Sequence, residues 1–285
     1  MLLTVEHRTE YRYEPPAQGL ALRLRLFPTP TAQQVVRDWQ VTVNGTAVKP
    51  LLTTGFGEKE ALWFERRKGE ALTVEARGTV ETQDQAGVLG REPRLRPAVY
   101  LRETPLTEPD EAVEALAAKA REETEAQGPL ALAHALNEAV HATLDYRAGA
   151  TDATTTAAEA AAIGAGVCQD FAHLFISAAR SLNLPARYVV GYLHDDEAPE
   201  MASHAWAEAY LDGLGWVGFD PVHEVCPTTA HIRLCTGFDA ADAAPIRGTM
   251  MAGSEEEMEV TVAVAAAQQQ SQRQSQGAGG KSGAS

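Results

Sequence analysis

Apolar and polar residues alternate along the first third of the chain, as in strands that bury one face. The alternation is clearest in residues 21–26 (ALRLRL), 39–43 (WQVTV) and 72–76 (LTVEA). Asn44-Gly45, directly after the second run, is the strongest short signal for a hairpin turn. We therefore expect residues 1–85 to form an N-terminal β-sandwich, followed by a connection without a sustained period.

Helical spacing begins near Thr107, where Thr107 and Asp110 resemble a helix start. Thr156 and Glu159 have the spacing of a capping box for a short helix that ends at Gly164. Besides this short helix, three helices are predicted because their apolar residues recur three or four positions apart. The helix that starts near Thr107 is the first of the three. These apolar sets are Val113, Leu116, Ala117 and Ala120; Leu132, Leu136, Val140 and Leu144; and Phe171, Leu174, Phe175, Ala178 and Leu182.

Three strand patterns follow the helices, at residues 188–193, 202–211 and 216–220. Helices followed by antiparallel strands indicate an α+β domain, because the repeated strand–helix–strand alternation of a parallel sheet is missing. We assign residues 98–265 to this domain. Residues 266–285 form a polar, low-complexity tail that cannot build a core, so we expect it to be disordered.

Charge and composition narrow the classes of partner. The chain has 24 Lys and Arg residues against 39 Asp and Glu residues, a net charge of −15, and such an acidic chain is a poor ligand for nucleic acid or anionic membranes. No apolar run approaches the ~20 residues that cross a bilayer, and the N-terminal sequence does not resemble a secretory signal. The chain has three cysteines, which is an odd number, and none of them forms a CxxC pattern. We therefore expect free thiols in a reducing compartment and no disulfide framework. We expect a cytoplasmic protein, and its oligomeric state stays open.

Cys168 lies at the first turn of the last predicted helix, after Gly164 and Gly166. A helix N-terminus carries a partial positive charge of about 0.5, which favours a thiolate and provides N–H donors for an oxyanion. The glycines permit a tight turn and close approach of a substrate. Most single cysteines serve only as small apolar side chains, and we assign Cys226 and Cys235 to that role. The setting of Cys168 instead favours a nucleophile.

The predicted hairpin provides a base and a carboxylate for this thiol. His204 and Asp220 are each eight residues from Asp212, which begins the Asp212-Gly213 turn, so a tight hairpin places them opposite each other. The carboxylate would fix the tautomer of the imidazole and leave its other ring nitrogen for Cys168. Without the cysteine, a buried structural His–Asp pair would be the preferred interpretation.

These segments resemble a known family. The run GVCQDFAHLFISAARSLNLPARYVVGYL, followed by SHAWAEAYLDGLGWVGFDP, is similar to the transglutaminase-like superfamily of cysteine enzymes. More narrowly, the chain resembles bacterial members that carry an N-terminal β domain, as judged also from His7-x-Thr9-x-Tyr11-x-Tyr13 and His231-Ile232-Arg233. The resemblance implies a papain-like fold in which Cys168 is the nucleophile, His204 the general base and Asp220 the orienting carboxylate.

The implied chemistry is acyl transfer through a thioester, with no cofactor or metal. The Cys168 backbone N–H would provide one oxyanion donor, and Tyr146 is our candidate for the second. We expect hydrolysis of an amide bond in a peptide or protein substrate, because nothing in the sequence identifies a channel in which an amine would outcompete water. Transfer of the acyl group to an amine and a non-catalytic peptide-binding module are the alternatives.

Overall fold

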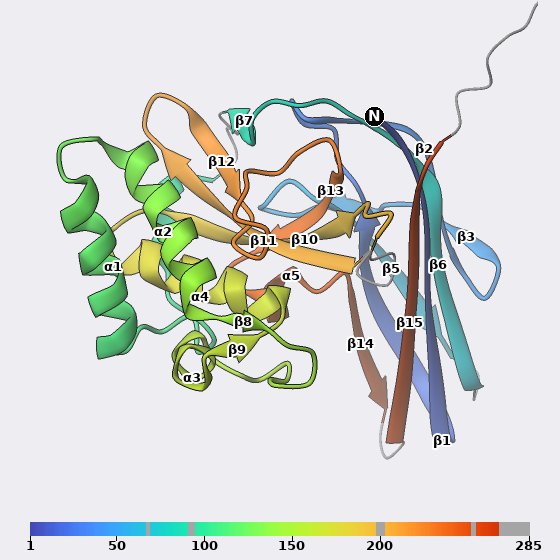
Figure 1. Ribbon diagram of the computed structural model, residues 1–285. Coiled ribbons are helices and arrows are strands. Elements are labelled where there is room, and N and C mark those ends of the chain that lie inside the picture. The colour runs from blue at the N-terminus through green and yellow to red at the C-terminus, as the bar shows by residue number, and fades with distance from the viewer. Residues whose placement is uncertain (67–68, 91–94, 198–202, 252–254, 268–285) are drawn as a thin grey trace, which may run out of the picture.

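The computed structural model describes residues 1–66, 69–90, 95–197, 203–251 and 255–267 (Figure 1). A strand-rich region and a region that combines helices with a second sheet lie side by side. The predicted disordered tail lies outside the described residues except for its first two positions, of which Ala266 ends a strand. In the described part of the chain, no helix is both long enough and apolar enough to span a membrane.

The strand-rich region is built around β1, which runs over 26 residues. Its sheet has the order β3-β2-β6-β1-β5-β4. The first half of β1 pairs with β6 and the second half with β5, so this one strand carries two groups of partners. The predicted hairpin at Asn44-Gly45 is confirmed, since both residues have positive φ (48° and 75°) as a type I′ turn requires. The strand bounds are β1 (Leu2–Phe27), β2 (Gln34–Val43), β3 (Thr46–Val48), β4 (Leu52–Thr53), β5 (Lys59–Glu65) and β6 (Gly69–Thr82).

Two strands from the other end of the chain complete this region. The strands β14 (Ile246–Met251) and β15 (Glu255–Ala266) both pair antiparallel with β1. Our predicted division placed residues 98–265 in the second domain, whereas this last stretch returns to the first (Figure 1). Alternation along a sequence identifies a strand but not its partner, so no local pattern places β15 beside β1.

The second region has the α+β architecture that the sequence predicted. The helices α1 to α4 pack on one another, and α4 and α5 pack on a five-stranded antiparallel sheet of order β13-β10-β11-β12-β7. The stretch that we expected to be only a connection contributes β7 (Val88–Gly90) to the edge of this sheet. The remaining bounds are η1 (Pro97–Leu101), α1 (Glu111–Thr124), α2 (Pro129–Thr143), β8 (Asp145–Tyr146), α3 (Ala157–Ile163), β9 (Ala165–Gly166), α4 (Cys168–Ser181), β10 (Ala186–Leu193), β11 (Ser203–Leu211), β12 (Gly215–Phe219), β13 (His231–Gly237) and α5 (Ala240–Ala243).

The helix boundaries follow their capping residues. Thr156 and Glu159 form the predicted capping box at α3, which ends at Gly164 in the left-handed conformation. The predicted start at Thr107 is wrong, because α1 begins after Asp110, whose side chain accepts a hydrogen bond from the Val113 N–H at 2.9 Å. The Thr107 hydroxyl instead accepts from the buried Arg180 guanidinium.

The two regions share a continuous apolar core. Tyr192 on β10 and Ile232 and Leu234 on β13 are buried in the same cluster as the inward-facing leucines of β1. His7 on β1 lies within 2.8 Å of the Tyr192 hydroxyl, measured from Nδ1. The outer strand β13 and its neighbour β10 therefore rest on the N-terminal region, while their helix-covered neighbour β11 carries part of the candidate site.

Candidate active site

Cys168 is the first residue of α4, and its backbone N–H is among those that have no acceptor within a helix. The side chain is half-buried. The helix start is fixed by Asp170, which accepts hydrogen bonds from the Val167 N–H at 2.8 Å and the Thr151 hydroxyl at 2.6 Å. A Cβ on Gly166 would lie 2.6 Å from the Asp170 carboxylate. Glycine is therefore needed at position 166 for this close packing, and the Asp170 carboxylate caps the start of α4.

The helix holds Cys168 at a set place relative to the sheet. Nearly the whole of α4 is buried, and its apolar residues share a core with Ala205, Ala207 and Ala209 of β11. Small side chains on this face of β11 let the helix approach closely, and a close-packed core of this kind keeps its parts in one arrangement.

His204 and Asp220 meet in a fully buried hydrogen bond of 2.8 Å between Nε2 and Oδ2. They are not directly opposite, however. Leu211 pairs with Gly215 and Ala207 with Phe219, so the hairpin is centred on Gly213 and not on Asp212. The predicted register is thus wrong by two positions. Since side chains on a strand alternate with a period of two, this shift leaves both groups on the same face, where they reach each other diagonally.

The second ring nitrogen of His204, Nδ1, is buried and has no hydrogen-bonding partner in the described part of the chain, and the Cys168 side chain lies close enough to affect the pKa of the ring. Burial alone would lower the pKa of His204, but the hydrogen bonds to Asp220 and Cys168 raise it to about 10. Burial raises the pKa of Asp220, and the hydrogen bonds from three histidines more than reverse this and hold it well below its usual range. The arrangement therefore favours an imidazolium that is hydrogen-bonded to the Asp220 carboxylate and lies next to the Cys168 side chain.

Two histidines that we had not assigned to the site also donate to Asp220. His223 Nδ1 lies 2.7 Å and His231 Nε2 lies 3.1 Å from the same carboxylate oxygen, Oδ2, that binds His204. The other oxygen, Oδ1, accepts from the Val222 N–H at 3.1 Å. His223 follows Asp220 by three residues, a spacing that could have signalled a turn contact. His231 comes from β13, and no local pattern in the sequence connects it with Asp220.

Tyr146, our candidate for the second oxyanion donor, lies on β8 beside the helix start. Residue 146 pairs with Gly166 on β9, two positions before Cys168. Burial raises the pKa of the Tyr146 hydroxyl, and the nearby Cys168 adds to this effect. The side chain is 44% exposed. Its hydroxyl is close enough to Cys168 to interact electrostatically with it.

His173, Cys226 and Cys235 behave as packing residues. His173 is fully buried in α4, where its Nε2 accepts from the Ala240 N–H at 3.0 Å. Cys226 is half-buried and Cys235 buried, and burial raises the pKa of both thiols. Among the described residues, His204, Asp220 and His231 place their ligand atoms within 4.8 Å of one another. Both rings also donate to the carboxylate oxygen between them.

Comparison with known proteins places this site in a family. The Transglutaminase-like superfamily model matches residues 111–221, and the model of the Bacterial transglutaminase-like N-terminal region matches residues 3–81. An uncharacterized protein of Mycobacterium leprae (strain TN) is 30% identical over 268 residues, which cover 86% of this chain and 92% of that protein. The chain belongs to the transglutaminase-like superfamily. The resemblance noted from the cysteine, histidine and aspartate segments is thereby confirmed.

Two further proteins are similar to this chain over most of its length. An uncharacterized protein of Mycobacterium bovis is 28% identical over 279 residues, which cover 89% of each chain. The crystal structure of a candidate cysteine protease from Cytophaga hutchinsonii superposes with a TM-score of 0.71 at 24% identity, over 94% of this chain and 92% of that one. The transglutaminase-like fold, with its strand-rich N-terminal region, is thus shared along nearly the whole chain.

Proposed function

We propose that this transglutaminase-like protein is a thiol enzyme that hydrolyses an amide bond in a peptide or protein, including the isopeptide bond of a modified side chain. One observation carries the proposal: His204 is hydrogen-bonded through Nε2 to Asp220, its Nδ1 has no other partner among the described residues, and the Cys168 side chain lies close enough to the ring to raise its pKa. This is the order of groups that activates a thiol nucleophile. Membership of a superfamily that includes cysteine enzymes supports it.

The first half of the reaction acylates the cysteine. The Cys168 thiolate attacks the carbonyl carbon of the amide, forming a C–S bond and a tetrahedral oxyanion. Collapse of this intermediate breaks the C–N bond, and His204 gives its proton to the departing amine. The Cys168 N–H at the start of α4 faces the developing oxyanion, and Tyr146 donates the second hydrogen bond. Each such donor typically contributes about 3 kcal/mol.

The second half releases the acyl group. Neutral His204 removes a proton from water, whose oxygen attacks the thioester carbonyl carbon. The C–S bond then breaks, which frees a carboxylic acid and restores the thiolate beside the imidazolium. Asp220 stays ionised throughout and holds the ring in the orientation that both proton transfers need.

Product mass distinguishes this reaction from its alternatives. A peptide-amide library is incubated with the protein, with and without excess methylamine, and the products are analysed by mass spectrometry. Hydrolysis predicts free acids under both conditions, and the Cys168→Ser variant should form none. N-methylamides as the main product with methylamine would contradict hydrolysis and establish acyl transfer to amines. Binding of library peptides without turnover would instead indicate a non-catalytic module.

A further inference from the structure

His231 is able to donate a hydrogen bond to Asp220 as a neutral imidazole. The Thr228 backbone N–H donates to His231 Nδ1 at 3.0 Å, so the proton of the neutral ring is on Nε2. That Nε2–H points at Asp220 Oδ2, 3.1 Å away. The ring is buried, and burial lowers the pKa of His231. His231 therefore donates to the carboxylate as a neutral group, without placing a second positive charge beside the His204 imidazolium.

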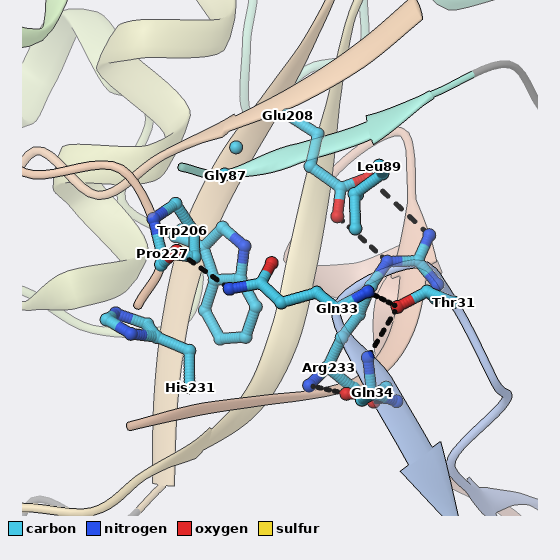
Figure 2. A pocket seen from close by; sticks show the side chains of 11 residues that line it. Thr31, Gln33, Gln34, Gly87, Leu89, Trp206, Glu208, Pro227, His231 and Arg233 are labelled. Carbon is cyan, nitrogen blue, oxygen red and sulfur yellow. Dashed lines mark hydrogen bonds and ion pairs between the residues drawn. The ribbon is translucent and has the colours of Figure 1, made fainter. Parts of the chain in front are cut away.

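The segment that fixes the His231 ring is itself held by the N-terminal region. The side-chain amide of Gln33, just before β2, donates to the carbonyl oxygens of Pro227 at 2.7 Å and Thr228 at 3.1 Å. Figure 2 shows Gln33 reaching across to Pro227 beside His231 and Trp206. Gln33 is 6% exposed, so these bonds are shielded from water. A buried amide that spans two regions of the fold keeps the peptide of Thr228 in position.

Thr82, Gln34 and Trp206 make further contacts with the same segment. The Thr82 hydroxyl, at the end of β6, donates to the Thr229 carbonyl oxygen. Gln34 bonds both backbone groups of Arg233, donating to its oxygen and accepting from its N–H at 2.8 Å each. Trp206 meets the His231 ring edge-on, with ring centres 5.4 Å apart. The start of β13 is therefore supported by three polar side chains of the strand-rich region.

We propose that His231 is a positioning residue that holds the Asp220 carboxylate toward His204, and that the N-terminal region supports it through Gln33. The path of contacts runs from the Gln33 amide to Thr228, from the Thr228 N–H to His231, and from His231 to Asp220. The inference rests on the proposed thiol chemistry, and it gives the N-terminal region a part in the reactivity of Cys168.

Alkylation of Cys168 by iodoacetamide at pH 6 tests this path without requiring the natural substrate. His231→Phe removes the donor, and we expect Cys168 to react about 10-fold more slowly, as loss of a hydrogen bond to a charged group predicts. His231→Gln places an amide N–H near the position of Nε2 and should stay within about 3-fold of the wild-type rate. Gln33→Leu should slow alkylation by about 3-fold. Gln40→Leu, on the exposed side of β2, is the matched control and should change nothing.

The double variant tests whether the two residues act in series. If Gln33 acts through His231, then Gln33→Leu combined with His231→Phe should react no more slowly than His231→Phe alone. Additive losses, or a His231→Gln rate as low as that of His231→Phe, would show a merely structural role and overturn the proposal.

Failure of the inference is distinguishable from failure of the proposed function. If wild-type Cys168 reacts at pH 6 no faster than Cys226 and Cys235, the thiol chemistry is wrong. If wild-type Cys168 is selectively reactive and folded His231→Phe matches it, the positioning role is wrong. Thermal unfolding and near-ultraviolet circular dichroism check the fold. Should His231→Phe fail to fold, His231→Asn replaces it, because the shorter amide falls short of Asp220, and a wild-type rate in that variant would overturn the proposal.

Discussion

Replacement of Asp220 by Asn perturbs the most highly connected group of the site. The carboxylate accepts from His204, His223 and His231 through Oδ2 and from the Val222 N–H through Oδ1. An amide has one acceptor oxygen, so whichever way it turns, its NH2 group faces a buried donor: the Val222 N–H or the His231 Nε2–H. Removing one partner from a buried charged pair typically costs 3–5 kcal/mol, and we expect Asp220→Asn to lower the free energy of unfolding by about that much.

The pH dependence of this loss follows from the direction of two pKa shifts. Hydrogen bonds hold the pKa of Asp220 below its ordinary value despite burial, so its stabilisation is complete above about pH 4 and is lost as the pH falls further. Burial lowers the pKa of His204, but its bonds to Asp220 and Cys168 raise it to about 10. That stabilisation is complete below about pH 6.5 and is lost as the pH rises toward 10. The difference between wild type and variant should therefore be largest between about pH 4 and 6.5.

Urea unfolding followed by tryptophan fluorescence measures this difference, because Trp206 and Trp216 are both buried in the second region. Wild type and Asp220→Asn are compared at several pH values from 3 to 10. A difference below about 1 kcal/mol near pH 5.5, or one that stays constant over the whole range, would refute the reasoning that Asp220 is an ionised, multiply bonded group paired with a protonated His204.

Two other substitutions test neighbouring parts of the site. Tyr146→Phe should slow hydrolysis of a peptide amide about 100-fold while leaving the unfolding midpoint unchanged, because its side chain is 44% exposed and the lost hydroxyl serves the oxyanion; an unchanged kcat would remove Tyr146 from the mechanism. Gly166→Ala should lower the free energy of unfolding by about 1–3 kcal/mol in urea titrations, because the new Cβ would lie 2.6 Å from Asp170. Full wild-type stability would mean that the helix start accommodates the methyl group.

Local patterns in the sequence were enough to predict the helices and the hairpin that carry the site. The capping box at Thr156 and the amphipathic spacing of α4 depend on residues within one or two helical turns, and both were predicted. The hairpin of β11 and β12 was also found, although its register was misjudged by two positions. Because the error was an even number of residues, the face shared by His204 and Asp220 was still correct.

Long-range pairing explains what sequence reasoning missed. The alternating segment of β15 has a clear strand pattern, yet nothing in it shows that it returns to β1, more than 240 residues earlier. Gln33, just before β2, and His231, on β13, come from the two different regions of the fold. They are brought together through the contact of Gln33 with Pro227 and Thr228, and His231 reaches Asp220. Their roles depend on how the two regions pack, and a pattern within either element carries no information about that contact.

Selective reactivity of one thiol is the most direct test of the account. Wild-type protein and the His204→Ala variant are treated with iodoacetamide from pH 5 to 9, and the labelled cysteines are identified by mass spectrometry of peptides. We predict that wild-type Cys168 is labelled far faster than Cys226 and Cys235 down to about pH 6, and that this advantage disappears in His204→Ala. Equal, slow labelling of all three cysteines, or a fast Cys168 in the absence of His204, would contradict the claim that His204 and the start of α4 activate this sulfur.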